Sequence, residues 1–272
     1  MKSFQSKKNH IYSGETKQRA INSESLATRL AVNKKYQSKD FQEWLFDKLA
    51  VVPGEKILDV GCGTGAQTIR FIEKIRRTGM VHALDISRDS IEDLKSSIGS
   101  FPNAEVVCAD MAHLEKLIRE DFESALGEYT LAHSSYALYY SPARLDVLKT
   151  MSESIAPYGR VAIFNPLTPH GLVEIAKSFG SVPEEVEESL SFGPDVLEAE
   201  FRKLFWEVEV HFFQSEMAVS NIDDFMDFYR ATTYYNAKIE SSIKDFAEKK
   251  ISSEGAVVYP KNGYLIIGRE KR

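Results

Sequence analysis

Cysteine is scarce in this chain, with only Cys62 and Cys108 among 272 residues. Two cysteines cannot build a disulfide framework, and nothing around them has metal-ligand spacing, so we expect no metal site and a reducing, cytoplasmic setting. No apolar run approaches the ~18 residues that span a bilayer. Residues 1–10 are polar and basic, without the apolar centre of a secretory signal. The sequence therefore predicts no membrane partner.

Positive charge is also in deficit, since 34 lysines and arginines stand against 40 aspartates and glutamates, for a formal net charge of -6. A protein that binds nucleic acid broadly needs excess cations to meet the phosphates, so we expect no nucleic-acid partner. The hydrophobic fraction of 43% is ordinary for a globular chain. A length of 272 residues allows two domains, or one α/β domain with insertions.

The most informative stretch carries three glycines at alternate positions between a predicted strand and a predicted helix. Residues 57–60 are mostly apolar, as in a strand covered on both faces, and residues 66–75 repeat isoleucine at helical spacing. Glycine accepts positive φ and has no Cβ, so Gly61, Gly63 and Gly65 let the backbone approach a ligand. A plain strand-to-helix turn is the alternative. The spacing fits neither the dinucleotide fingerprint nor the Walker loop.

With Asp59 two residues before the first glycine, this string resembles the first motif of class I S-adenosylmethionine-dependent methyltransferases. The resemblance implies that S-adenosyl-L-methionine is the cofactor and S-adenosyl-L-homocysteine the product. It also implies that Asp59, Cys62 and the three glycines belong to the cofactor site. The resemblance is specific over about residues 55–165 and architectural elsewhere.

The second predicted strand, residues 80–85, ends in an acid twenty residues past Gly65. A carboxylate at the end of this strand can accept both ribose hydroxyls of an adenosine, which is the role we expect for Asp85. The following Ile86 is a further cofactor-site candidate. A plain helix N-cap is the alternative for Asp85, but Ser87 is better placed to cap the next helix.

The third predicted strand also ends in an acid, Asp110, followed by Met111. In the family that the sequence resembles, a carboxylate here often accepts from the adenine amino group, and the next residue offers its backbone N–H to the ring. Asp110 is alternatively a cap for the helix that begins near Ala112. Three strand-terminal signals at regular spacing favour the ligand site, because doubly wound sheets bind ligands at the carboxyl ends of their strands.

The fourth predicted strand and its exit cover residues 129–141. By resemblance, Ser134 or Ser135 flanks the methionine part of the cofactor, with Ser134 preferred, and Tyr139 and Tyr140 line the substrate side. The exit lacks the Asn/Asp-Pro-Pro-Tyr/Phe string of many enzymes that methylate nucleobase or amide nitrogens. A nucleobase or glutamine substrate is therefore disfavoured.

Two histidines are candidates for proton transfer. His133 lies inside the fourth strand, which favours a hydrogen-bonded structural histidine. His170 falls just past the carboxyl end of the fifth strand, residues 160–164, and is the candidate catalytic base. A water-exposed loop histidine is the alternative for His170.

The remaining segments predict helices around this core. Residues 1–50 form an N-terminal helical segment that acts as part of a lid, with Tyr36 as a candidate ligand contact. Residues 51–272 form the methyltransferase domain, with helical cap insertions at about 168–205 and 220–255. The second insertion separates the last two strands by nearly fifty residues, which is too long for a hairpin turn.

Aromatic residues in the second insertion divide into two groups. Tyr229, Tyr234 and Tyr235 have polar tips and are candidates for substrate binding. Phe225 and Phe228 are expected in the core. Aromatic faces attract cations, so the sequence slightly favours an amine over a hydroxyl acceptor.

We therefore expect an α/β fold, a Rossmann-like doubly wound seven-stranded sheet with N-terminal helices and a helical cap. The sequence resembles the small-molecule branch, the trans-aconitate and histamine methyltransferase type, and predicts N- or O-methylation of a small-molecule substrate. A nicotinamide oxidoreductase, a non-catalytic S-adenosylmethionine-binding protein and a methyltransferase of a macromolecule are the alternatives. The sequence leaves a homodimer open.

Overall fold

The computed structural model describes residues 12, 14–99, 101–180 and 182–272, and within them eight strands form one sheet. The strands are β1 (Lys56–Val60), β2 (Met80–Asp85), β3 (Ala104–Cys108), β4 (Tyr129–Ser135), β5 (Ile155–His170), β6 (Phe205–Phe213), β7 (Glu216–Val219) and β8 (Val257–Lys271). Seven of them follow the order β3-β2-β1-β4-β5-β8-β6, in which β1 to β5 pair in parallel and β8 and β6 pair antiparallel. The expected doubly wound seven-stranded sheet is confirmed, with β7 as one strand more.

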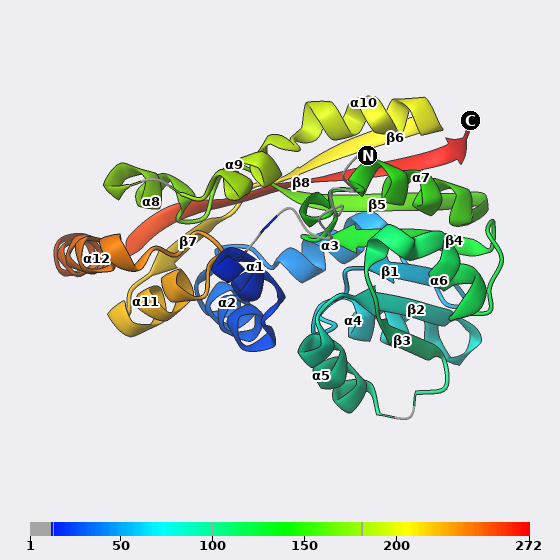
Figure 1. Ribbon diagram of the computed structural model, residues 1–272, viewed down its shortest axis with the longest axis horizontal. Helices are drawn as coiled ribbons and strands as arrows, with labels where there is room; N and C mark the ends of the chain where they lie inside the picture. Colours follow the sequence, from blue (N-terminus) through cyan, green and yellow to red (C-terminus); the bar gives the residue numbers. More distant parts are fainter. Residues whose placement is uncertain (1–11, 13, 100, 181) are drawn as a thin grey trace, which may run out of the picture.

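The helices cover both faces of this sheet (Figure 1). They are α1 (Gly14–Ile21), α2 (Ser23–Tyr36), α3 (Phe41–Leu49), α4 (Thr68–Ile75), α5 (Arg88–Ile98), α6 (Leu114–Glu120), α7 (Arg144–Ser154), α8 (Val173–Phe179), α9 (Glu184–Ser191), α10 (Pro194–Leu204), α11 (Ile222–Arg230) and α12 (Glu240–Glu254). Helices α3, α4 and α5 pack on one face and α6, α7 and α10 on the other. Alternate strand residues supply the two cores, because successive side chains of a strand point to opposite faces. None of these helices is long and apolar enough to cross a membrane.

A third core lies at one end of the sheet, apart from the two cores on its faces. It joins α8, α11 and α12 to residues of α2, α9, β7 and the first part of β8. We call these elements, α2, α8, α9, α11, α12 and β7, the cap. Figure 1 shows them gathered at one end of the molecule, with the long strands β5 and β8 running out toward them. The cap therefore rests on an extension of the same sheet that forms the two other cores.

Strand β5 is longer than the sequence predicted. The fifth strand was expected at residues 160–164, but β5 begins at Ile155 and contains an irregular stretch in which Tyr158 has φ +65°. His170, expected just past the strand, is the last residue of β5 and pairs with Lys261 of β8. The antiparallel β5–β8 pair carries this region beyond the neighbouring β4.

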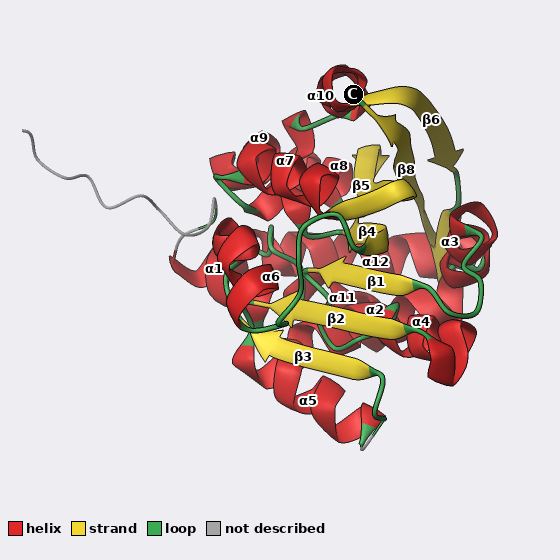
Figure 2. Ribbon diagram, turned by 90° about the vertical axis from the view of Figure 1, so that its right-hand side faces the viewer, coloured by secondary structure: helices red, strands yellow, loops and turns green. Residues whose placement is uncertain are grey.

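The parallel strands set the position of the site. Strand β1 has β2 on one side and β4 on the other, so the chain leaves β1 in one direction and later returns to its other side. Ligands of doubly wound sheets bind outside the carboxyl ends of the strands at such a switch point. Figure 2 looks across β1, β2 and β3, which lie side by side. Homodimer formation stays a prediction, since one chain is described.

Candidate functional site

A cavity of about 660 Å³ opens at the carboxyl ends of the parallel strands. Its walls come from the loop after β1, the ends of β2, β3 and β4, helix α2 and the cap. Its size is that of a pocket for a cofactor and a small molecule together. The predicted residues that line it are Gly61, Cys62, Gly63, Asp85, Ile86, Asp110, Met111, Tyr139, Tyr140, His170 and Tyr234.

The glycine loop uses its three glycines for different purposes. A Cβ at Gly61 would lie 2.2 Å from the Cβ of Ala137, and a Cβ at Gly65 would lie 2.2 Å from Cδ1 of Leu94. These two glycines allow close packing, and Gly65 does not line the cavity. A Cβ at Gly63 would meet only the Cδ2 end of Leu26, at 2.9 Å, in a residue whose φ is +54°. Gly63 is therefore the glycine that keeps the loop open to the cavity.

The Asp85 carboxylate ties this loop to the end of β2. Its Oδ2 accepts the backbone N–H of Gly63 at 2.8 Å, and its Oδ1 accepts the backbone N–H of Ser87 at 2.8 Å. Burial raises the pKa of Asp85, and the hydrogen bonds from Ser87 and Gly63 oppose that shift. Ser87 caps α5 through its Oγ, which accepts the backbone N–H of Ser90, as the sequence predicted. Asp85 thus reaches the cavity wall already oriented by the backbone.

Asp59 requires a correction. The sequence placed it in the cofactor site, but it is 2% exposed and does not line the cavity. Its Oδ2 accepts the hydroxyl of Thr68 at 2.6 Å, and its Oδ1 lies 2.9 Å from Nδ1 of His133. Asp59 therefore joins β1, β4 and the start of α4. The structural role predicted for His133 is confirmed.

The third strand end brings two candidates to the cavity. Oδ1 of Asp110 accepts the backbone N–H of Ala112 at 2.9 Å, so Asp110 does cap the following turn. It lines the cavity as well, next to Met111. The two interpretations of Asp110 are compatible, because a carboxylate has acceptor positions beyond the one that a cap uses.

The exit of β4 differs from the prediction. Ser134 is fully buried and does not line the cavity, whereas Ser135 does. The Ser135 hydroxyl has no hydrogen-bond partner among the described residues. Tyr136, which the sequence did not single out, also lines the cavity and has φ +55°. The strained backbone turns its ring toward His170, with the ring centroids 6.0 Å apart.

Three predicted tyrosines do not line the cavity, because each is held elsewhere. The hydroxyl of Tyr36 donates to Asp224 of α11 at 2.5 Å. Tyr229 donates to the backbone carbonyl of Asn236, and Tyr235 donates to Glu240. The Tyr36 hydroxyl joins α2 to α11, and the other two fasten the segment between α11 and α12. Phe225 lies in the core as expected, and Phe228 is buried and also forms part of the cavity wall.

Tyr234 lines the cavity near His170. Its hydroxyl oxygen accepts the backbone N–H of Leu172 at 3.1 Å. The Nδ1 of His170 lies 2.5 Å from the carbonyl oxygen of Asn262. A carbonyl oxygen only accepts, so Nδ1 carries the proton and Nε2 of the neutral ring keeps a lone pair. Burial, with the nearby Lys261 cation, lowers the pKa of His170 to about 3.

Two cations that the sequence did not single out face the same region. Lys261 lies opposite His170 in the β5–β8 register, and both line the cavity. Arg29 of α2 lines it too, and its Nη1 donates to the carbonyl oxygen of Ala231 at 2.6 Å. Burial and the Arg29 charge lower the pKa of Lys261 to about 8. The β5–β8 register decides the position of Lys261, and the packing of α2 decides that of Arg29. Neither feature can be recognised from the neighbouring sequence.

A family described as "Methyltransferase domain" matches residues 52–207, more than half of the chain. The chain belongs to this methyltransferase family. The matched range contains β1 to β5, the glycine loop, Asp85 and Asp110. Arg29, Tyr234 and Lys261 lie outside it.

Curated relatives of this methyltransferase match about half of the chain. The demethylmenaquinone methyltransferase of Lysinibacillus sphaericus (strain C3-41) is 30% identical over 113 residues, which cover 42% of this chain and 45% of that protein. The protein of the same name from Staphylococcus aureus (strain JH9) is 29% identical over 133 residues, which cover 49% of this chain and 52% of that protein. The chain thus spans about half the length of these relatives.

Solved structures show the same fold. The YcgJ protein from Bacillus subtilis superposes with a TM-score of 0.58 at 12% identity, over 84% of this chain and 97% of that chain. A putative methyltransferase from Bacillus halodurans C-125 has a TM-score of 0.54 at 15% identity, over 82% of this chain and 95% of that chain. At these identities the likeness establishes the Rossmann-like architecture of the methyltransferase.

Proposed function

We propose that this protein is an S-adenosylmethionine-dependent methyltransferase that methylates a nitrogen or oxygen of a small molecule. The observation that carries the proposal is the Asp85 carboxylate, held on the cavity wall by two backbone N–H groups. Each of its oxygens has a second acceptor position. The two vicinal hydroxyls of a ribose are a matching pair of donors. Family membership supports the same cofactor.

The residues at the strand ends fit this cofactor. Gly63 leaves the loop open beside the cavity, and the Ser135 hydroxyl lacks a partner among the described residues. Asp110 has acceptor capacity left after capping its turn. We assign Asp85 to the ribose, Asp110 and Met111 to the adenine, and Gly63 and Ser135 to the methionine part. Cys62 and Ile86 complete the walls.

S-adenosylmethionine, when bound, supplies a methyl group on a sulfonium, so the cofactor carries the activation. The protein's part is to position the acceptor and exclude water, and alignment alone contributes ~7–11 kcal/mol. Nε2 of His170 accepts an N–H or O–H of the acceptor and so orients it. Its pKa of about 3 makes His170 a weak base, which suits orientation better than proton storage.

A small molecule is favoured over a macromolecule because the cap covers one end of the cavity. The demethylmenaquinone methyltransferases carry the name of a small-molecule substrate, which supports the same class here. The trans-aconitate and histamine methyltransferase type, and the division into an N-terminal lid before residue 51 and a capped domain after it, are parts of this proposal. The fold of the cap around residues 173–254 supports both.

Calorimetric titration with S-adenosylmethionine and S-adenosylhomocysteine tests the cofactor. Hydrogen bonds to a charged group contribute ~1.5–3 kcal/mol each, so Asp85→Ala is expected to weaken binding by about tenfold or more. Asp93→Ala, at an exposed position of α5, is the matched control and should bind as the wild type does. Unchanged affinity in a folded Asp85→Ala variant would remove the ribose assignment.

Turnover tests the reaction. The protein is incubated with methyl-labelled cofactor and extracts of small metabolites, and the formation of S-adenosylhomocysteine and labelled product is followed by mass spectrometry. Tight cofactor binding without turnover on any acceptor would favour the non-catalytic binding protein. Labelling confined to a transfer RNA or a protein would overturn the small-molecule part.

A further inference from the structure

Carboxylates and cations both line the cavity wall, and the cations include Lys34, Lys39 and Arg70 as well as those of the cap. The lining carboxylates are Asp85 and Asp110 at the strand ends and Asp40 at the start of α3. The cap end, which we define by Arg29, Tyr140, His170, Tyr234 and Lys261, contributes cations and no described Asp or Glu to the wall. An ammonium ion alone would be repelled from this end.

Lys261 is fixed in its place by the sheet. It pairs with His170 across β5 and β8, and directly opposed residues of an antiparallel pair project from the same face. Its Nζ lies 5.7 Å from the ring centroid of Tyr136 and 5.8 Å from that of Phe228. Two rings therefore flank the ammonium, and all three residues line the cavity.

Arg29 approaches from α2 on the other side. Its Nη1 is held by the carbonyl oxygens of Ala231, at 2.6 Å, and Arg19, at 3.5 Å. Its Nε and Nη2 form no hydrogen bond within residues 12, 14–99, 101–180 and 182–272. The Arg29 guanidinium therefore keeps Nε and Nη2 available as donors beside the cavity. Its charge lowers the pKa of Lys261, so the two cations share one region of low dielectric constant.

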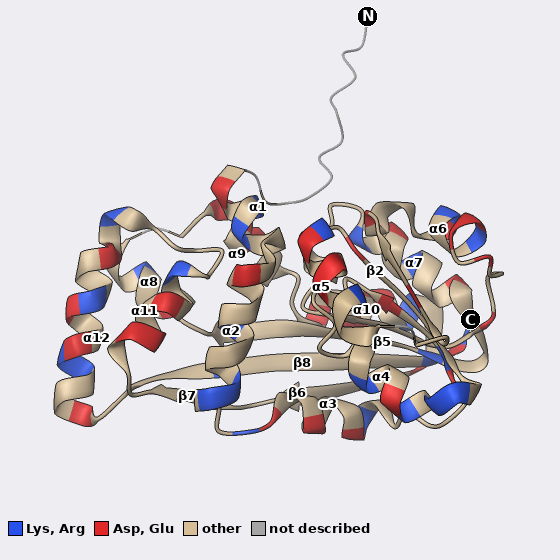
Figure 3. Cartoon of the chain, turned by 90° about the horizontal axis from the view of Figure 1, so that it is seen from below, with Lys and Arg blue, Asp and Glu red and all other residues tan. Residues whose placement is uncertain are grey.

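Neither cation has a carboxylate partner in the described part of the chain. Residues 1–11, which the structure does not describe, contain no aspartate or glutamate, nor do positions 13, 100 and 181. Lys244 and Lys250 of α12 are different, because each forms an ion pair with a glutamate four residues on. Figure 3 shows this mixture of charges along α12. Two like charges facing one buried cavity are costly unless a ligand neutralises them.

We infer that the methyl acceptor carries a carboxylate, which Lys261 and Arg29 bind at the cap end of the cavity. The guanidinium offers two parallel donors to the two carboxylate oxygens, and the ammonium adds a point charge. The hydrophobic and aromatic walls formed by Phe228, Tyr140 and Tyr234 fit an acceptor whose carboxylate stands on an apolar skeleton. The inference deepens the proposed function, since it names the class of acceptor for that same cavity.

The test uses matched probes on the full chain. Calorimetric titrations compare benzoate, benzamide and benzylamine, and hexanoate, hexanamide and hexylamine, with and without saturating S-adenosylhomocysteine. Each set keeps one skeleton and changes only the charge. We expect at least one carboxylate to bind ten times more tightly than its amide, and the amines to bind most weakly. Inorganic phosphate is titrated as a separate arm.

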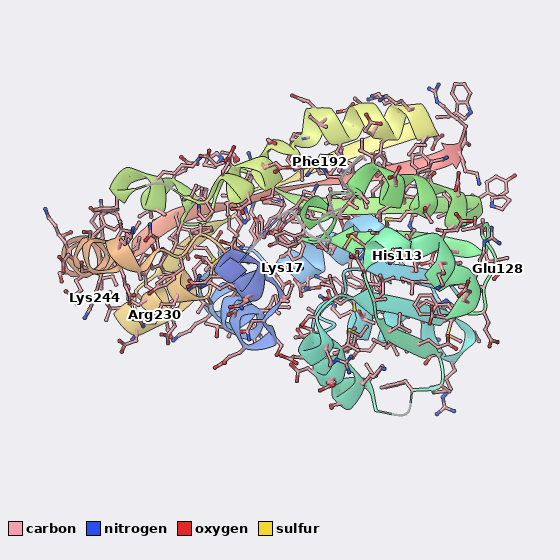
Figure 4. The ribbon with its side chains drawn as sticks, viewed as in Figure 1. Lys17, His113, Glu128, Phe192, Arg230 and Lys244 are labelled. Carbon is pink, nitrogen blue, oxygen red and sulfur yellow. The ribbon has the colours of Figure 1, made fainter. Side chains whose placement is uncertain are left out.

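Lys261→Gln and Arg29→Gln should each reduce the carboxylate-to-amide ratio to below three. Lys244→Gln, on the outer face of α12 (Figure 4), removes an equal charge away from the cavity and should keep the ratio of the wild type. Melting curves show that each variant is folded. A ratio that survives in folded Lys261→Gln and Arg29→Gln would overturn the inference.

The other outcomes are equally decisive. Preference for an amine, equal binding of carboxylate and amide, or no carboxylate binding at all would refute the inference. Phosphate binding at the affinity of the best carboxylate would replace it with a phosphate site. If the cofactor binds and the carboxylate does not, this inference fails alone. If the carboxylate preference stands and S-adenosylmethionine does not bind, the proposed function fails alone.

Discussion

Lys261→Met is expected to make the protein more stable at pH 7. The substitution keeps an unbranched stem of similar length and removes the ammonium. Burial and the Arg29 charge lower the pKa of Lys261 to about 8, from its ordinary value of 10.5. A pKa that is lower in the folded state means that the native protein disfavours the charge. The methionine variant escapes that cost.

The magnitude follows from the shift. One pKa unit corresponds to ~1.4 kcal/mol, so the shift corresponds to about 3 kcal/mol. The variant loses the contacts of the ammonium with the Tyr136 and Phe228 rings, worth ~0.5–1 kcal/mol each. The net gain in the free energy of unfolding is then about 1 to 2 kcal/mol, or a rise in Tm of about 2–6 °C.

The pH dependence identifies the cause. Below pH 8 Lys261 is charged in both states and the variant has its full advantage. From pH 8 to 10.5 the native state of the wild type has released the proton while the unfolded state still holds it, so wild-type stability rises and the advantage shrinks. His170, with a pKa of about 3, and Tyr136, whose pKa is raised by burial, do not titrate in this range. Urea unfolding of both proteins from pH 7 to 10 measures the difference in their free energies of unfolding. A variant that is less stable than the wild type at pH 7, or a difference that does not change with pH, would refute the reasoning.

Three further predictions concern the loop and the histidines. Gly63→Val should abolish cofactor binding in a folded protein. A valine Cβ at this position would lie 2.9 Å from Cδ2 of Leu26, in a residue whose φ is +54°. A normal affinity in calorimetry would make the loop a purely structural turn. His170→Gln should lower kcat/KM by about fivefold to tenfold through one lost hydrogen bond, and a wild-type inflection near pH 6.5 that the variant lacks would contradict the pKa of about 3. Asp59→Asn should lower the free energy of unfolding by about 1–3 kcal/mol, because the buried His133 loses its charged partner; an unchanged melting temperature would refute that role.

The strand ends and the glycine loop were predictable because their signals are local. The apolar runs before Gly61, Asp85 and Asp110 are short, and each of these three residues lies at the end of a strand or within two residues after it. The far part of β5 was not predictable in this way, because Pro166 and Pro169 argue against a strand. Pairing with β8 overrides that preference. Strand β7 likewise depends on its partner, since four residues carry little pattern of their own.

The candidate site shows the same difference between local signals and contacts that depend on distant parts of the chain. Tyr234 faces the cavity, whereas its neighbour Tyr235 donates to Glu240 and Tyr36 donates to Asp224, 188 residues away in the sequence. No spacing rule separates these three tyrosines. The slight preference for an amine rested on the attraction of tyrosine faces and of the acidic residues 184–200 for cations. It could not take account of Lys261, whose position depends on the β5–β8 register.

The boundary of the family match explains why the cofactor is easier to assign than the acceptor. Residues 52–207 include the loop and the strand-end carboxylates Asp85 and Asp110, which we assign to the cofactor. Arg29 precedes this range, and Tyr234 and Lys261 follow it, yet the fold brings all three to one end of one cavity. Of the residues that define the cap end, the shared range contains Tyr140 and His170 but neither of the two cations. The class of acceptor that binds at the cap end therefore has to be inferred from the charged residues of the cap end itself, and those charges are positive.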